Sequence, residues 1–308
     1  MNIDMQFFMQ QERCSSNTRA NNARVPLSDL DPGALYTLEE MLGDGTTSIV
    51  FKAIHPIHGN VAVKRFRKEY TFHAKTEFTK LRMVQGHPSF TKLYDFWEDQ
   101  GYAYIAMELL EGELLYLCTE EQMSFEEINW ACIDILSGLN YLHNIGYIHF
   151  DLKPENIGYK WDGTRRVYKI IDLGSAFSMQ EVETSSFQEE MDSSTKILTT
   201  IEYRPFEAIH LDGTQRHNEK TDVWSFGCVL YEMWTGNRLF ENCSGSNTKQ
   251  ENKDELQLGL TAIESLQELQ DSEDNFIVKL LKNSIVQQVE KRMSAHQLLS
   301  LMDGHFDV

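Results

Sequence analysis

Short runs in which apolar and polar residues alternate dominate the chain from Tyr36 to Leu110. The runs SIVFKAI and NVAVKRF, separated by turn residues at 58–60, predict two antiparallel strands. Two later runs, TKLYDFWED and YAYIAMELL, predict two more strands. Between the pairs, EFTKLRMVQG carries apolar residues near helical spacing and predicts a helix that ends at a Gly-His-Pro sequence. This part of the chain therefore predicts a small unit rich in β-structure.

Beyond Gly112 the apolar residues recur with the spacing of helices. Residues 125–144 carry a continuous apolar face, and Ser124 followed by acidic residues is typical of a helix start. A hairpin with its turn at Asp162 and Gly163 interrupts the helices, which resume at 222–235 and again near the C-terminus. We therefore expect an α+β fold in which a small β-rich lobe precedes a larger α-helical lobe, with a cleft between them.

The composition narrows the class of protein. The chain has 308 residues, enough for two lobes with a substantial core, and its 28 Lys and Arg against 47 Asp and Glu give a net charge of −19. Such an acidic chain is not expected to bind nucleic acid directly. Five cysteines without CxxC spacing favour a reducing compartment and argue against a structural zinc site. No signal peptide or membrane-spanning run is apparent, so we expect a cytoplasmic or nuclear protein.

Candidate nucleotide-binding residues lie in the β-rich part. The motif LGDGTTSIV joins two predicted strands, and its glycines would let the backbone approach phosphate oxygens, although glycines of this kind also occur in ordinary turns. In VAVK, Ala62 and Lys64 point to the same face of a strand. A half-buried lysine needs an anionic partner, which could be phosphate or Glu77. The candidates from the glycine motif are Leu42, Gly43, Asp44, Gly45 and Val50.

Candidate catalytic residues follow the long predicted helix. In HFDLKPEN, Asp151 would accept or orient the proton of a substrate hydroxyl, and Lys153 would neutralise charge on a phosphoryl group. Asn156 and Asp172, the latter in IDLG, would hold magnesium ions. The alternative is that both aspartates serve as turn or capping residues. Their placement, one in a loop after a long helix and one at a strand end, favours the functional interpretation.

The ordered motifs LGDGTTSIV, VAVK, HFDLKPEN, DLG, TIEYRPFE and DVWSFGCVLYEMWTG resemble those of the eukaryotic protein kinase family. The resemblance covers roughly residues 36–306. It implies a flexible lead-in at 1–35, an N-lobe at about 36–107, a hinge at about 108–112 and a C-lobe at about 113–306, with ATP and Mg²⁺ used to phosphorylate proteins. The serine/threonine branch is implied by Lys153 and Thr200.

The same resemblance implies further roles by position. Met107 is similar to the gatekeeper behind the adenine pocket, and Glu108 and Leu110 to hinge residues that offer backbone hydrogen bonds. Glu207 and Arg292 are similar to a buried ion pair that anchors the substrate-docking segment. Asp222, which follows Thr221 and opens the DVWSFG motif, is a structural candidate.

Several positions depart from the family pattern. Phe150 stands where many relatives have an arginine that binds a phosphate on the activation segment. We interpret this as a change of control, with no strict need for phosphorylation of that segment. Leu173 replaces the usual Phe, Pro205 and Phe206 replace Ala-Pro, and Ser48 replaces a third glycine.

Substrate preference and rival functions are less constrained. Four acids near the expected cleft, Glu111, Glu113, Glu120 and Glu121, suggest protein substrates with basic residues near the phosphoacceptor, although such acids are commonly just solvated. The polar run 241–274 is interpreted as a solvated excursion that could also dock a partner. The rivals to a serine/threonine protein kinase are a pseudokinase scaffold and a small-molecule kinase.

Overall fold

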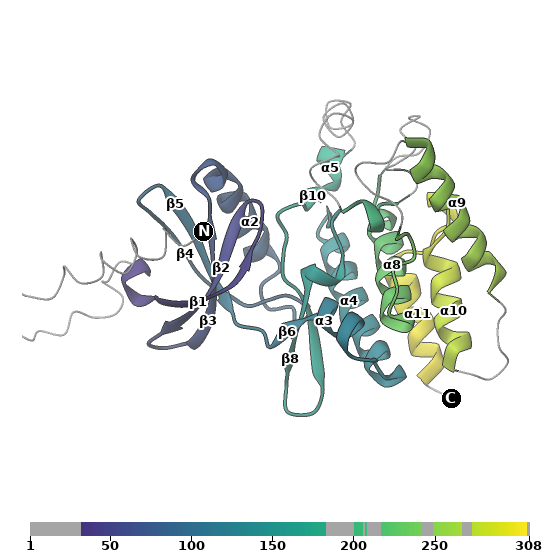
Figure 1. Ribbon diagram of the computed structural model, residues 1–308, viewed down its shortest axis with the longest axis horizontal. Coiled ribbons are helices and arrows are strands. Elements are labelled where there is room, and N and C mark those ends of the chain that lie inside the picture. The colour runs from purple at the N-terminus through teal and green to yellow at the C-terminus, as the bar shows by residue number, and fades with distance from the viewer. Residues whose placement is uncertain are drawn as a thin grey trace, which may run out of the picture.

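A five-stranded antiparallel sheet forms one end of the molecule, and helices form the other (Figure 1). The computed structural model describes residues 32–182, 200–205, 207, 217–241, 249–266 and 273–306, so most of the predicted lead-in lies outside the described residues. The sheet has the order β1-β2-β3-β5-β4. Its strands are β1 (Thr37–Asp44), β2 (Ser48–His55), β3 (Gly59–Phe66), β4 (Leu93–Asp99) and β5 (Tyr102–Glu108).

The register of the sheet gathers the predicted nucleotide-binding residues on one face. Val50 pairs with both Gly43 and Lys64, and Ala62 pairs with Met107. Paired residues on neighbouring strands share a face, and residues two apart on one strand do so too. The side chains of Val50, Ala62, Lys64 and Met107 therefore project from the same side of the sheet.

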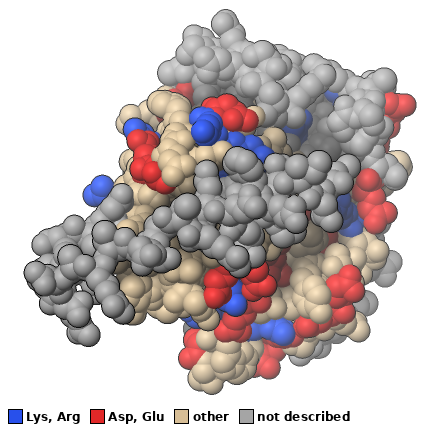
Figure 2. Space-filling view, turned by 60° about the vertical axis from the view of Figure 1, so that its left-hand side comes forward, with Lys and Arg blue, Asp and Glu red and all other residues tan. Residues whose placement is uncertain are grey.

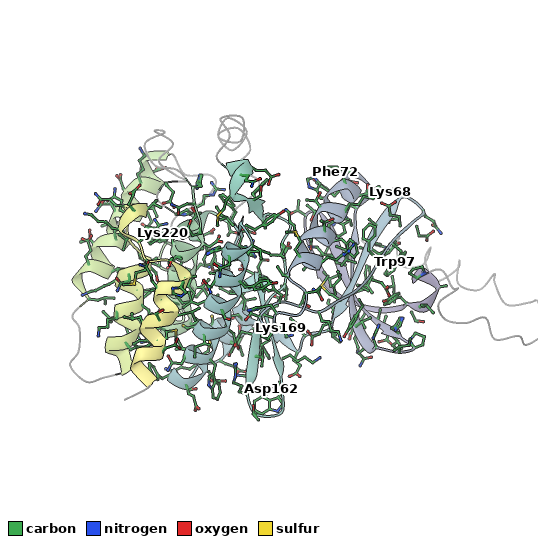
Figure 3. The ribbon with its side chains drawn as sticks, turned by 180° about the vertical axis from the view of Figure 1, so that it is seen from behind. Lys68, Phe72, Trp97, Asp162, Lys169 and Lys220 are labelled. Carbon is green, nitrogen blue, oxygen red and sulfur yellow. The ribbon has the colours of Figure 1, made fainter. Side chains whose placement is uncertain are left out.

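The opposite face of the sheet carries a stack of aromatic rings. Tyr36 follows the short helix η2 (Pro32–Leu35), and its ring lies 4.8 Å from Trp97 and 4.7 Å from His55. Trp97 in turn lies 4.9 Å from Tyr104 with its ring parallel. Trp97, labelled in Figure 3, therefore stacks with two tyrosines of the small lobe. Ala53, Val61, Val63 and Ala106 complete this second apolar cluster.

Helix α2 (Thr71–Met83) begins six residues before the predicted stretch at 77. No side chain caps its first turn, and Phe72 points outward with 76% of its surface exposed. The start of α2 thus lacks both the capping signal and the apolar periodicity from which a helix start is predicted. Its buried residues are Ala74, Glu77 and Leu81.

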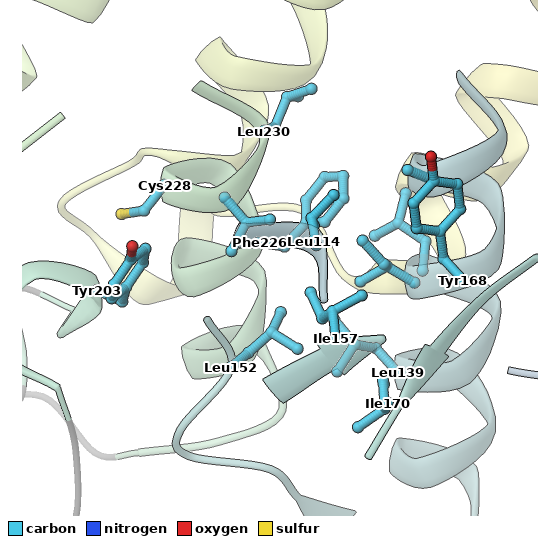
Figure 4. Packing of buried hydrophobic residues seen from close by; sticks show 14 of the residues in the cluster. Leu114, Leu139, Leu152, Ile157, Tyr168, Ile170, Tyr203, Phe226, Cys228 and Leu230 are labelled. Carbon is cyan, nitrogen blue, oxygen red and sulfur yellow. The ribbon is translucent and has the colours of Figure 1, made fainter. Parts of the chain in front are cut away.

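The larger lobe is built around helices α4 (Phe125–Asn144) and α8 (Lys220–Thr235). Ser124 and Glu127 form a complete capping box at the start of α4, as the sequence indicated. Leu114, Leu139, Ile157 and Phe226 meet in the main apolar cluster (Figure 4). The other helices of the described residues are α3 (Leu114–Glu120), α5 (Met179–Val182), α9 (Lys249–Ser265), α10 (Glu273–Ser284) and α11 (Ala295–Phe306), with short helices η3 (Lys68–Tyr70), η4 (Pro154–Asn156), η5 (Ile201–Tyr203) and η6 (Val289–Lys291).

Short strands follow the five-stranded sheet along the chain. The predicted hairpin is β8 (Ile157–Trp161) and β9 (Arg166–Ile170), with Asp162 at its tip (Figure 3). Strand β6 (Gly112–Glu113) pairs with β8, and β10 (Phe177–Ser178) pairs with β7 (Tyr147–Ile148). In the predicted run 241–274, residues 249–265 form α9, while 242–248 and 267–272 lie outside the described residues.

These elements confirm the predicted α+β fold with a small β-rich lobe and a larger α-helical lobe. The exact lobe and hinge limits stay predictions. Within the described part of the chain, no helix combines the length and apolar character that a membrane span requires. Basic and acidic side chains lie next to one another on the face shown in Figure 2.

Candidate active site

Lys64 lies between two carboxylates, one from each lobe. Its Nζ is 2.7 Å and 2.9 Å from the carboxylate oxygens of Glu77 on α2 and 3.0 Å from Asp172. Burial by itself lowers the pKa of Lys64, but the charges of Asp172 and Glu77 outweigh burial and raise it. Burial also raises the pKa of Asp172, yet Lys64 and the Gly174 N–H hold that pKa down at about 2. The lysine is therefore charged and fixed where strand, helix and DLG motif meet.

The glycine motif forms a tight turn between β1 and β2. The N–H of Gly45 donates to the carbonyl of Ser48 at 2.9 Å, and a Cβ at Gly45 would lie 3.3 Å from that same oxygen. Arg67 donates to the Asp44 carboxylate at 2.6 Å and to the Gly45 carbonyl at 3.3 Å. The positive charge of Arg67 therefore lies next to the Asp44 carboxylate at this turn.

The predicted hinge residues connect the sheet to the β8–β9 hairpin. The backbone N–H of Glu108 donates to the Lys92 carbonyl at 2.8 Å, so of the two backbone groups of Glu108 the carbonyl oxygen is the candidate for adenine. The Glu108 carboxylate binds Lys160 at 3.0 Å and Lys169 at 2.9 Å. Leu110 packs closely on Gly158, because a Cβ atom added to Gly158 would lie only 2.4 Å from the Cδ1 atom of Leu110. Met107 is buried at the end of β5, and Leu42 on β1 is about half exposed.

Asp151, Lys153, Asn156 and Thr200 converge in the large lobe. The Asp151 Oδ1 accepts from the Thr200 N–H at 3.0 Å, and its Oδ2 lies 3.2 Å from the Lys153 Nζ. Lys153 donates to the Thr200 hydroxyl at 2.6 Å. The Asn156 amide nitrogen donates to the Asp151 backbone carbonyl at 2.7 Å and to its carboxylate at 3.1 Å. These contacts hold the Asp151 carboxylate in one orientation.

Asp222 holds the backbone of this loop through hydrogen bonds. It is fully buried at the start of α8 and accepts from the backbone N–H groups of His149 at 2.8 Å and Phe150 at 2.9 Å. Its carboxylate also lies 2.8 Å from the His143 Nε2. Phe150 has φ 66°, a left-handed conformation that a bulky residue adopts only when its surroundings enforce it. Asp222 supplies that enforcement.

Glu207 and Arg292 form a buried, two-bond ion pair. Both bonds between their side chains are 2.9 Å long, and neither side chain is exposed. Arg292 also donates to the carbonyl oxygens of Lys220 and Val286, and it faces the Trp224 ring at 5.1 Å. All donors of the guanidinium fork are thus directed at acceptors or a ring.

The departures from the family pattern occupy apolar sites. Phe150 is 4% exposed, packs with Ile148, and meets the ring of Phe177 edge-on at 5.7 Å. Leu173 is fully buried in the main cluster. Ser48 and Pro205 are buried too, whereas Phe206 lies outside the described residues.

The donor set fits magnesium and nucleotide phosphates. Because the Asn156 amide nitrogen faces Asp151, its amide oxygen is available to a cation. Asp172 adds a carboxylate, and Mg²⁺ typically takes one or two protein oxygens and completes its shell with phosphates and water. Lys64 supplies a fixed cation on the same side.

Lys80 and Arg238 are among the site residues that the sequence did not predict. Lys80 on α2 donates to the Gly174 carbonyl at 3.1 Å. Arg238 lies 3.7–3.9 Å from Glu155, Glu202 and Glu232. A lone cation on a helix or loop is usually solvated, so neither carried a signal of its own.

Comparison with known proteins agrees with this geometry. The model of the protein kinase domain family matches residues 36–301, and the chain belongs to that family. The family uses ATP, typically with Mg²⁺, to phosphorylate proteins.

Among curated proteins, the chain is 33% identical to mouse sperm motility kinase 3A over 72% of this chain and 42% of that protein. It is 30% identical to a Caenorhabditis elegans putative ribosomal protein S6 kinase alpha-2 over 72% of this chain and 30% of that one. It is also 30% identical to the Arabidopsis thaliana 3-phosphoinositide-dependent protein kinase 1 over 70% of this chain and 44% of that protein. The chain thus spans less than half the length of these relatives.

Proposed function

We propose that this chain transfers the γ-phosphate of Mg-ATP to serine and threonine hydroxyls of proteins. The observation that carries the proposal is the convergence of Asp151, Lys153 and Thr200, opposite a Lys64 already bound to Glu77 and Asp172. Mg-ATP would supply the phosphoryl group. Asp151 would take the proton from the substrate hydroxyl, and Lys153 would stabilise charge on the transferred group. Asn156 and Asp172 would hold the metal.

The first experiment measures phosphate transfer from labelled Mg-ATP to a mixed Ser/Thr/Tyr peptide library. Asp151→Asn is expected to reduce the rate by about 10²–10⁴, because it removes the proton acceptor. Lys64→Met should also lose transfer. Asp162→Asn, at the tip of the β8–β9 hairpin, is the matched control and should keep it (Figure 3). If the wild type stabilises on ATP binding without turnover, the chain is a pseudokinase scaffold instead.

We further propose that the activation segment does not need phosphorylation. The support is that Phe150 places an apolar ring against Phe177 and near Met179, where an arginine would need a phosphate partner. Phosphatase-treated and untreated protein should therefore transfer phosphate at equal rates. Loss of activity on phosphatase treatment would overturn the idea.

Basic protein substrates are the preferred class that we propose. Of the acids first considered, Glu121 is paired with Arg166 at 3.2 Å, whereas the pKa of Glu113 is raised by burial and by the charge of Glu155. Glu155, Glu202 and Glu232 surround one guanidinium, that of Arg238. This surplus of carboxylates favours a further cation from a substrate.

Peptides with arginine near the phosphoacceptor should give a higher kcat/KM than matched peptides with glutamate. Glu155→Gln should narrow the difference, and Glu264→Gln, an exposed acid on α9, should leave it unchanged. Equal rates on both peptide sets would refute the preference.

A cytoplasmic or nuclear location is also proposed, because Cys118 and Cys132 are free, buried thiols. Imaging of the tagged full-length protein tests this, and entry into the secretory pathway would contradict it.

A further inference from the structure

Lys80 lies one turn beyond Glu77 on α2. Residues three apart on a helix share a face, so Lys80 and Glu77 both point toward the DLG segment. The Lys80 Nζ donates to the Gly174 carbonyl at 3.1 Å and lies 5.5 Å from the centre of the Phe177 ring. The lysine therefore reaches from the small lobe to the start of the activation segment.

This placement is unusual for a lysine on a helix surface. Long charged side chains normally extend their charge into water, and a partly buried ammonium group is costly unless a partner compensates it. Lys80 is half-buried, and no ion pair joins it to a carboxylate among the described residues. Burial lowers the pKa of Lys80, and the nearby charges of Glu77, Glu181 and Asp172 oppose that effect. Its direct contacts are the Gly174 carbonyl oxygen and the face of the Phe177 ring.

The contact between Lys80 and Gly174 completes a closed set of interactions around Asp172, the predicted metal ligand. Glu77 binds Lys64, and Lys64 binds Asp172. The other carboxylate oxygen of Asp172 accepts from the Gly174 N–H at 2.7 Å. The carbonyl of the same Gly174 accepts from Lys80, which returns to α2 one turn from Glu77. Displacing Lys80 would remove the direct hydrogen bond between α2 and Gly174 and leave the link through Lys64.

The same lysine touches the activation segment through Phe177. The ring of Phe177 meets Lys80 on one side and Phe150 on another. Phe150 in turn is held by Asp222 through its backbone. Contacts thus run from α8 through the catalytic loop to α2 without a phosphate group.

We propose that Lys80 is a positioning residue that holds Asp172 in its metal-binding orientation and couples α2 to the activation segment through Gly174 and Phe177. The inference rests on the kinase activity proposed above. Lys80 acts through Asp172 and does not itself touch the nucleotide.

The test compares Lys80→Met, Lys80→Arg and Lys75→Met in the full chain. Lys75 is the control, because it lies on the same helix and pairs at the surface with Glu98 at 3.1 Å. Lys80→Met should lower kcat about tenfold and raise the Mg²⁺ concentration for half-maximal rate several-fold, since small displacements of a reacting group cost this much. The KM for the peptide should not change. Lys80→Arg keeps a donor and should restore most of both values.

A purely structural role predicts a different pattern. In that case Lys80→Met would lower the melting temperature, and kcat would fall without a change in the Mg²⁺ requirement. That result, or Lys80→Met behaving like Lys75→Met, would overturn the proposal.

A second readout separates this proposal from the proposed activity. If the wild type shows no transfer, the Mg²⁺ dependence of its thermal stabilisation by ATP still reports the orientation of Asp172. If Lys80→Met needs a higher Mg²⁺ concentration for the same stabilisation, and Lys80→Arg does not, the positioning role is supported even without turnover. The same curve in all three variants would refute it.

Discussion

At the scale of single residues, buried charges were the most predictable feature. Lys64 could be assigned an anionic partner from sequence, because a buried ion without a counter-ion is too costly to persist. Glu207 and Arg292 were paired by their resemblance to a family motif, and the structure has both in one ion pair. Lys80 could not be found in this way. Its partners are a backbone carbonyl and a ring, and sequence pattern carries no signal for either.

Arg292→Met would leave Glu207 buried without its cation. We expect a loss of about 3–5 kcal/mol in the free energy of unfolding, measured by urea titration. Lys75→Met breaks an exposed pair and should cost less than about 1 kcal/mol. The double variant Arg292→Met, Glu207→Gln should recover part of the loss. Equal stability of Arg292→Met and Lys75→Met would contradict the role of the pair.

The thiol of Cys118 should be unreactive in the folded protein. Burial, with the charges of Glu232 and Glu155, raises its pKa to about 12. Folding therefore favours the protonated form of the thiol. The contribution of this group to the free energy of unfolding is fully present below its unfolded pKa of about 9, and it is lost as the pH rises toward 12. In a Cys14→Ser, Cys243→Ser variant, a thiol reagent near neutral pH should label the folded protein far more slowly than the protein unfolded in urea. Similar rates in both states would count against burial of this thiol.

At the scale of elements, prediction succeeded where two local signals coincided. Helix α4 has both an N-terminal capping box and a continuous apolar face, and its bounds match the predicted 125–144. The start of α2 has neither signal and was missed. The hairpin turn was recognisable because Asp162 accepts from the N–H groups of Thr164 and Arg165, a bonding pattern typical of Asp in turns.

Ser124→Ala removes the hydroxyl that accepts from the Glu127 N–H at the start of α4. A loss of about 1 kcal/mol in unfolding free energy is expected from urea denaturation. Ser300→Ala is the control, because that hydroxyl only donates to the His296 carbonyl within α11. An equal effect of both substitutions would mean that the capping box is not important for α4.

At the scale of the whole molecule, the order of the two lobes followed from sequence, but their connection did not. Glu108 in the predicted hinge binds Lys160 and Lys169, which lie 52 and 61 residues further along the chain. Lys169 lies where the two lobes meet (Figure 3). Pairing over such separations depends on the folded arrangement of the lobes, which local patterns do not contain.

Glu108→Gln would leave both lysines without their shared carboxylate. The Lys169 and Lys160 hydrogen bonds outweigh burial and lower the pKa of Glu108, so the group is ionised near neutral pH. We expect a loss of about 1.5–3 kcal/mol in stability and faster proteolysis between the lobes. Glu98→Gln, in an exposed pair, should change neither. Unaltered proteolysis of Glu108→Gln would show that these bonds do not restrain the lobes.

The stacked rings behind the sheet give the small lobe an optical signature of its own. Of the five tryptophans, Trp97 alone falls within residues 32–107, and it lies parallel to Tyr104 and nearly parallel to Tyr36. Stacked chromophores couple, so near-ultraviolet circular dichroism should contain a band that belongs to this stack. Because Tyr36 lies just before the first strand, the part of the band due to its stacking on Trp97 would be lost when that segment leaves the sheet, even while the large lobe stays folded.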